Sequence, residues 1–100
     1  MTSQIISQNR QAIDKIAEEN DISYLALFGS YSRGEQKKNS DLDLLVTFDK
    51  TKGLFELVDV QDKLSQVLGV KVDLVTKNGL SRYIKPYIQD DLQIIYEKKS

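Results

Sequence analysis

A glycine–serine pair followed by two closely spaced aspartates constrains this chain more than any other feature. The apolar run Tyr24–Phe28 stops at Gly29-Ser30, and a second apolar run, Leu44–Val46, opens after Asp41 and Asp43. Ten residues separate Ser30 from Asp41. Apolar runs bounded by glycine and polar residues are typical of buried strands. The stretch therefore predicts a strand, a tight turn, a short helix, a loop and a second strand.

The polar residues between the two predicted strands have the chemistry of an anion and metal site. Glycine lets the backbone turn sharply and approach a ligand, and a helix starting at Ser30 would direct free N–H groups toward an anion. Asp41 and Asp43 project from one face of a strand, where two carboxylates about 4 Å apart repel by roughly 4 kcal/mol at an effective dielectric near 20. A divalent cation such as Mg²⁺ removes that repulsion. A phosphate-binding turn facing paired carboxylates is the outline of a phosphoryl or nucleotidyl transfer site.

The composition excludes several kinds of catalytic site. The 100 residues include no cysteine and no histidine, which rules out thiolate nucleophiles, serine–histidine triads and almost every zinc site. With 14 basic and 15 acidic residues the net charge is −1, so the chain lacks the positive charge of a general nucleic-acid binder. No apolar run reaches the length of a membrane span and the N-terminus has no signal-peptide pattern, so we expect a soluble cytoplasmic protein.

The hydrophobic periodicity predicts one small α/β domain covering residues 1–100. A hydrophobic content of 40% is enough for a single modest core. The expected elements, in chain order, are a helix over 4–19, a strand over 22–28, a turn with a short helix over 29–36, a strand over 41–48, a helix over 54–68, a strand over 70–75, helical structure over 80–91 with a new helix starting near Pro86, and a strand over 92–96. This order favours a small mixed β-sheet packed with helices.

Residue spacing assigns faces to two of these elements. The helix over 54–68 has one predicted apolar face, made of Leu54, Leu57, Val58, Leu64 and Leu68. Phe55 falls off that face, so it either contacts a partner or packs at the edge of the core. In the strand over 41–48, Leu42, Leu44 and Val46 share one face, and Asp41, Asp43 and Leu45 share the other.

A third aspartate lies where it can join the first two. Asp73 is on the strand face opposite to Val72 and Leu74, and it comes alongside Asp41 and Asp43 if their strands are neighbours. Taken alone, Asp73 is as consistent with a structural role as with a ligand role. The adjacent lysines 37 and 38, in the connecting loop, either meet phosphates or are simply solvated.

The pattern from Gly29 to Asp43 resembles the signature of the DNA polymerase β-like nucleotidyltransferases. In that signature a Gly-Ser pair precedes Asp-x-Asp at the head of a strand. The ten-residue spacer, with Arg33-Gly34 and Ser40 inside it, is similar to that of the minimal nucleotidyltransferase (MNT) subfamily, whose members are antitoxins of HEPN toxins. The resemblance covers nearly the whole chain and implies the polymerase β-like nucleotidyltransferase fold.

The resemblance also implies roles for individual residues. Asp41 and Asp43 would hold two Mg²⁺ ions between the protein and the nucleotide phosphates, and Asp73 would complete the catalytic metal site. Ser30 and the backbone amides around Gly29 and Ser30 would bind the phosphates of ATP, with help from Arg33. By the same resemblance, AMP would pass from ATP to a tyrosine of a HEPN ribonuclease toxin.

Two other functions compete with this interpretation. A non-catalytic module could neutralise its partner by occlusion, using apolar residues that lie off the core face, such as Phe55, Tyr83 and Tyr87. Alternatively, a nucleotidyltransferase of this size could act on a small molecule or on an RNA end, in which case it would need no protein partner.

Overall fold

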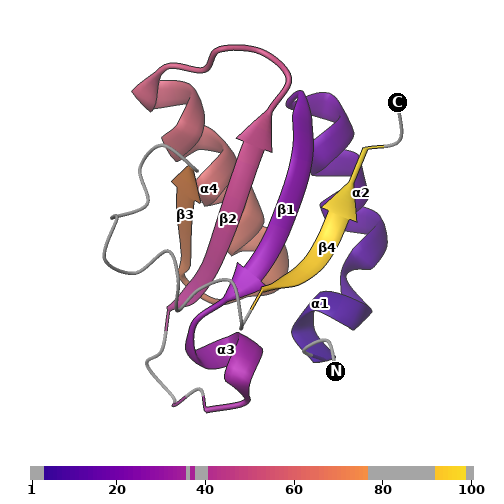
Figure 1. Ribbon diagram of the computed structural model, residues 1–100, viewed down its shortest axis with the longest axis vertical. Helices are drawn as coiled ribbons and strands as arrows, with labels where there is room; N and C mark the ends of the chain where they lie inside the picture. The colour runs from indigo at the N-terminus through magenta and orange to yellow at the C-terminus, as the bar shows by residue number, and fades with distance from the viewer. Residues whose placement is uncertain (1–3, 36, 38–40, 77–91, 99–100) are drawn as a thin grey trace.

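A computed structural model describes residues 4–35, 37, 41–76 and 92–98 and shows one four-stranded sheet with helices (Figure 1). Its elements are α1 (Gln4–Gln8), α2 (Arg10–Glu19), β1 (Ile22–Phe28), α3 (Ser30–Arg33), β2 (Leu42–Phe48), α4 (Leu54–Leu68), β3 (Val72–Thr76) and β4 (Gln93–Glu97). The helix expected over 80–91 lies outside the described residues. Within the described part, no helix is long and apolar enough to cross a membrane.

The sheet is mixed, as predicted, and its strand order is β3-β2-β1-β4. β1 pairs antiparallel with both β2 and β4. β3 runs parallel to β2, because α4 connects the end of β2 back to the start of β3. The strand over 22–28 has the predicted bounds, and the ends of the other three strands differ from the predicted ones by at most two residues. Because the strand order is β3-β2-β1-β4, the first three strands are neighbours. This arrangement can bring Asp73 next to the aspartate of β2.

The main core lies between the sheet and the helices α1, α2 and α4, which cover one of its faces (Figure 1). Leu42, Leu44 and Val46 of β2 point into this core, as their spacing predicted. A smaller apolar cluster, Ala26, Phe28 and Leu45, lies on the other face. β1 is consequently buried on both faces, as its continuous apolar sequence indicated.

The N-terminal region is two helices, where the sequence predicted a single helix over 4–19. α1 and α2 meet at Asn9, whose backbone (φ −118°, ψ 20°) leaves the helical region. The Asn9 side chain donates to the carbonyl of Ile5 (2.8 Å), and its backbone N–H donates to Ile6 (3.2 Å). An asparagine side chain that bonds to nearby backbone groups competes with the regular helix, and at Asn9 the helix is interrupted. In α2, the residues Ile13, Ile16 and Ala17 are buried.

α4 has the predicted bounds, but its predicted apolar face is wrong at two positions. Its core residues are Val60, Leu64 and Leu68, with Leu57 and Val67 packed beside them. Leu54 is 73% exposed and Val58 is 44% exposed. At 100° per residue, Val58 lies about 120° around the helix from Leu64, so it points away from the sheet. Phe55 is 91% exposed, so the alternative that it packs at the edge of the core is also wrong.

Candidate active site

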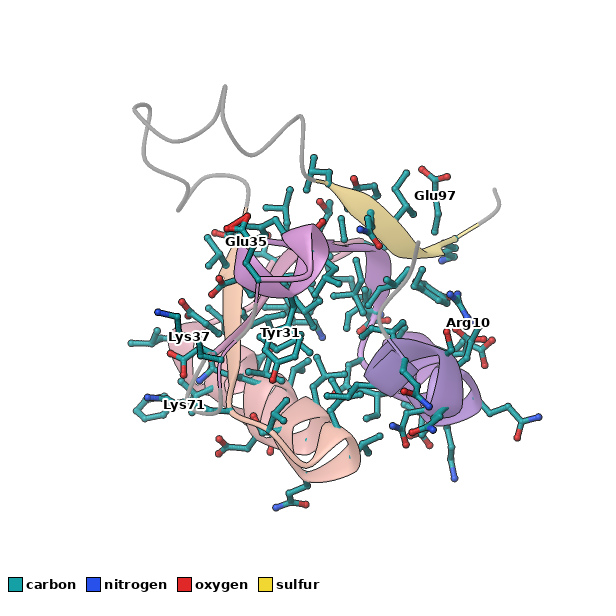
Figure 2. All side chains as sticks on the ribbon, turned by 90° about the horizontal axis from the view of Figure 1, so that it is seen from below. Arg10, Tyr31, Glu35, Lys37, Lys71 and Glu97 are labelled. Atoms are coloured by element: carbon teal, nitrogen blue, oxygen red, sulfur yellow. The ribbon has the colours of Figure 1, made fainter. Side chains whose placement is uncertain are left out.

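The turn that follows β1 is a short, tightly folded segment anchored in the core. Gly29 (φ 78°) ends the strand, α3 occupies four residues, and Gly34 (φ 71°) ends the helix. The Ser32 N–H donates to the Gly29 carbonyl (3.1 Å), and the Gly34 N–H donates to the Tyr31 carbonyl (3.4 Å). Figure 2, seen from the α3 end, shows the Tyr31 side chain pointing inward, where it joins the main core. The predicted turn and short helix are therefore present.

The last strand also holds this segment. The Gln93 side chain, at the start of β4, donates from Nε2 to the Ser32 carbonyl at 2.8 Å. The carbonyls at the end of a short helix have no partner within the helix, so this contact satisfies one of them. Gln93 was not singled out in the sequence, because a glutamine 61 residues further along the chain shows no signal of such a contact.

Asp43 packs directly against the glycine of the turn. Phe28, the last residue of β1, is the register partner of Asp43 in β2. A Cβ added to Gly29 would collide with Asp43 Oδ2 and lie 3.3 Å from its Cγ. Only glycine fits here, because the position combines a left-handed backbone with a carboxylate in the space a side chain would occupy. The structure thus brings together Gly29 and Asp43, two of the residues selected from the sequence.

Asp73 lies beside Asp43 on the neighbouring strand. The two residues are register partners in the parallel ladder between β2 and β3. Leu44 and Leu74, which follow them, point into the main core, so both aspartates project from the opposite face of the sheet. Adjacent strands are about 4.8 Å apart, a spacing at which one cation can contact carboxylates from both. The predicted juxtaposition of these two aspartates is confirmed by the register.

Asp41 is placed differently from the other two aspartates. It lies one residue before β2 begins, and it is exposed. Within residues 4–35, 37, 41–76 and 92–98, no three acidic, histidine or cysteine side chains gather closely enough to hold a metal ion. Mg²⁺ commonly binds one or two protein carboxylates and takes its other ligands from water and substrate phosphates. The Asp43–Asp73 pair fits that mode of binding, whereas a closed cage of three carboxylates is not formed.

The remaining residues selected from the sequence lie around α3. Ser30 and Arg33 are its first and last residues, and their side chains lie outside the described part of the structure. Glu35 and Lys37 follow the helix and are exposed (Figure 2). Residue 38, the second lysine of the predicted pair, also lies outside the described residues. The roles expected of Ser30, Arg33 and Lys37 in phosphate binding therefore stay predictions.

The opposite end of the sheet carries a network of ion pairs. Lys52 Nζ lies 2.9 Å from Asp21 Oδ2, and Lys98 Nζ lies 2.6 Å from Asp49 Oδ2. The backbone N–H of Asp49 donates to the Asp21 carbonyl (2.8 Å), which joins the two pairs. The hydrogen bond from Lys52 lowers the pKa of Asp21 below its usual 3.8 and raises the pKa of Lys52 above 10.5. These contacts join the α2–β1 turn, the β2–α4 connection and the residue that follows β4.

A large hollow also lies at that opposite end. It has a volume of about 580 Å³ and is formed by the β2–α4 connection together with residues such as Val46, Leu57 and Thr76. Neither aspartate of the candidate site lines it. We therefore assign the candidate site from the carboxylates and the turn, and not from this hollow.

Known proteins share this fold. The nucleotidyltransferase domain family matches residues 10–95 of the chain. A candidate protein adenylyltransferase of Methanocaldococcus jannaschii is 41% identical over 78 residues, which are 77% of this chain and 80% of that relative. A solved candidate minimal nucleotidyltransferase is similar with a TM-score of 0.77 and 29% identity, over 93% of this chain and 95% of that one. One chain of a solved toxin–antitoxin complex with AMP-PNP is similar with a TM-score of 0.75 and 28% identity, over 91% of this chain and 75% of that one.

These likenesses define the class of the protein. Its small mixed sheet with helices is the polymerase β-like nucleotidyltransferase fold. The chain belongs to the nucleotidyltransferase domain family, and its resemblance to the minimal nucleotidyltransferases is confirmed. It is therefore an enzyme domain of the nucleotidyltransferase type, as the Gly29-Ser30 and Asp41-x-Asp43 pattern predicted.

Proposed function

We propose that this chain transfers AMP from ATP to a hydroxyl group of a partner protein in a Mg²⁺-dependent reaction. The observation that carries the proposal is the Asp43–Asp73 register pair next to the Gly29 turn. Carboxylates on rigid strands suit a reaction that depends on positioning and charge. Chemistry of this kind needs neither histidine nor cysteine, and the chain has none of either.

The acceptor in this proposal is a tyrosine of a HEPN-type toxin, and the chain is the antitoxin of that toxin. Two similar proteins support it. The Methanocaldococcus jannaschii relative is a candidate protein adenylyltransferase, and the solved toxin–antitoxin complex contains AMP-PNP, a close analogue of ATP. The tyrosine and the HEPN partner come from the resemblance of the site motif to the minimal nucleotidyltransferases.

In this proposal some residues bind the metal and others bind the nucleotide phosphates. Asp43 and Asp73 would hold the catalytic metal, and Asp41, exposed just before β2, would add a further carboxylate. In an in-line displacement at the α-phosphorus, with pyrophosphate as the leaving group, Mg²⁺ held by these residues would supply positive charge for the attacking and departing oxygens. The backbone amides around Gly29 and Ser30 bind the nucleotide phosphates. Arg33, at the end of α3, adds positive charge next to these amides and so also favours the phosphates.

The test is the intact mass of the partner. The protein is incubated with ATP, Mg²⁺ and a HEPN-type toxin from the source genome, and the toxin is weighed by mass spectrometry. We expect the toxin to gain the mass of AMP with the wild type and to gain none with Asp43→Asn or Asp73→Asn. Asp62→Asn, an exposed position on α4, is the control and should behave as the wild type. An unmodified toxin with the folded wild type would contradict the proposal.

One observation favours a second function, in which the chain neutralises its partner by binding alone. Leu54, Phe55 and Val58 form an exposed apolar patch at the start of α4, and it is bordered by Glu56 and Asp59, which are paired with Lys52 and Lys63. An apolar surface with a polar border suits a partner that covers it with apolar residues of its own. If occlusion is sufficient, Asp43→Asn still protects cells from the toxin and Phe55→Ser does not. The enzymatic proposal requires Asp43→Asn to lose protection.

A further inference from the structure

The strand that carries Asp73 lies at an edge of the sheet. Among the described strands β3 pairs only with β2, so the alternate N–H groups on its other side face no described strand. Two of these groups are bound by side chains of α4. The Val72 N–H donates to Ser65 Oγ at 3.0 Å, and the Leu74 N–H donates to Gln61 Oε1 at 2.9 Å. The two contacts bracket Asp73 on both sides.

The Ser65 side chain is also hydrogen-bonded within α4, to the backbone of Gln61. Ser65 donates its hydroxyl hydrogen to the Gln61 carbonyl, four residues earlier in α4, at 2.9 Å. This bond orients the hydroxyl so that a lone pair remains for the Val72 N–H. Leu64, between them in sequence, is buried in the core and fixes the helix against the sheet. Helix, edge strand and sheet are thus joined at the residues next to Asp73.

We propose that Gln61 and Ser65 are positioning residues for Asp73. They hold β3 in the register that places the Asp73 carboxylate beside Asp43, and so they set the metal affinity of the site without contacting the metal. The inference rests on the proposed function, because it assigns Asp73 to metal binding. A five-residue edge strand frays easily, and a shift of one residue would turn Asp73 to the other face.

The variants separate the hydrogen bonds from the bulk of the side chains. Gln61→Leu and Ser65→Ala remove the acceptors, whereas Gln61→Glu and Ser65→Thr keep them. Gln66→Leu makes the same chemical change at an exposed position of α4 and is the matched control. Thermal melts identify any variant that fails to fold. If Gln61→Leu unfolds, Ser65→Ala and the two conservative variants carry the test.

Two measurements follow on the folded variants. Amide hydrogen exchange in the metal-free protein reports on the N–H groups of Val72 and Leu74, and calorimetry reports the affinity for Mg²⁺ with AMP-PNP. Gln61→Leu should speed exchange at Leu74, and Ser65→Ala should speed it at Val72. Each should weaken the metal affinity about 10-fold, the lower end of what outer-shell changes cost. The acceptor-keeping variants and Gln66→Leu should stay within about 2-fold of the wild type, far below that loss.

The outcomes separate this inference from the proposed reaction. Faster amide exchange with unchanged metal affinity would show a purely structural role for Gln61 and Ser65 and would overturn the inference. Unchanged amide exchange in both variants would also overturn it. If the wild type binds Mg²⁺ and AMP-PNP but transfers no AMP to the toxin, the proposed reaction is wrong. The Mg²⁺ affinities of the Gln61 and Ser65 variants then still test whether these residues position Asp73. If Asp73→Asn leaves the metal affinity unchanged, Asp73 is not a ligand and the inference is overturned.

Discussion

Gly29→Ala is the substitution that tests the contact between the turn and the carboxylate most sharply. In the described part of the chain, Gly29, Gly34 and Gly69 have left-handed backbones with φ between 71° and 78°. An alanine in that conformation costs about 1–2 kcal/mol of stability wherever it is placed. A Cβ at Gly34 or Gly69 meets nothing within 4 Å, whereas at Gly29 it meets the carboxylate of Asp43. The clash should add about 1–3 kcal/mol, which is typical of overpacking.

The comparison of the three alanine variants therefore isolates the clash. Urea denaturation should show Gly34→Ala and Gly69→Ala destabilised by about 1–2 kcal/mol, and Gly29→Ala by about 2–5 kcal/mol. AMP transfer should fall by about 100-fold in Gly29→Ala, because displacement of a catalytic group by about 1 Å has effects of that size. Asp43→Ala removes the carboxylate, so the added cost of Gly29→Ala should disappear in the double variant. Equal stability and activity for Gly29→Ala and Gly34→Ala would refute the reasoning.

Two further predictions concern stability. Because Lys52 lowers the pKa of Asp21 below 3.8, the ionised carboxylate stabilises the fold above that pH, and the contribution is lost as pH falls through the lowered value. Urea denaturation from pH 6 to pH 3 should show this loss in the wild type and a shallower pH dependence in Asp21→Asn; identical curves would contradict it. Leu64→Ala, at a fully buried position, should cost about 2–5 kcal/mol, whereas Phe55→Ser should change stability by less than about 0.5 kcal/mol. A large loss in Phe55→Ser would mean that Phe55 is part of the core.

The sequence predicted the elements whose residues interact locally. β1 and β2 are rich in apolar residues, and α4 ends at Gly69 in the left-handed conformation that terminates helices. The apolar face of α4 was assigned wrongly at Leu54 and Val58, because periodicity does not show where the supporting sheet ends. The break at Asn9 depends on a side-chain hydrogen bond that competes with the helix, which composition alone does not reveal.

The candidate site was predictable in its residue types and only partly in its geometry. Asp43 and Asp73 pair only because β2 and β3 are neighbours, and the sequence did not show that these two strands would be adjacent. Asp41 was expected on the strand beside Asp43, but the strand starts one residue later. Gln61 and Ser65 gave no signal, because polar residues on an amphipathic helix are ordinarily taken to face solvent. Contacts between distant segments, such as theirs with β3, follow only from the fold.

The central claim is that Asp43 and Asp73 bind one metal together next to the turn at Gly29. The direct measurement is the affinity for Mn²⁺ in the presence of AMP-PNP, followed by electron paramagnetic resonance, for the wild type and for the single variants Asp43→Asn and Asp73→Asn. The account predicts that each variant weakens binding by at least about 10-fold. Wild-type affinity in Asp73→Asn, with the protein folded, would contradict it.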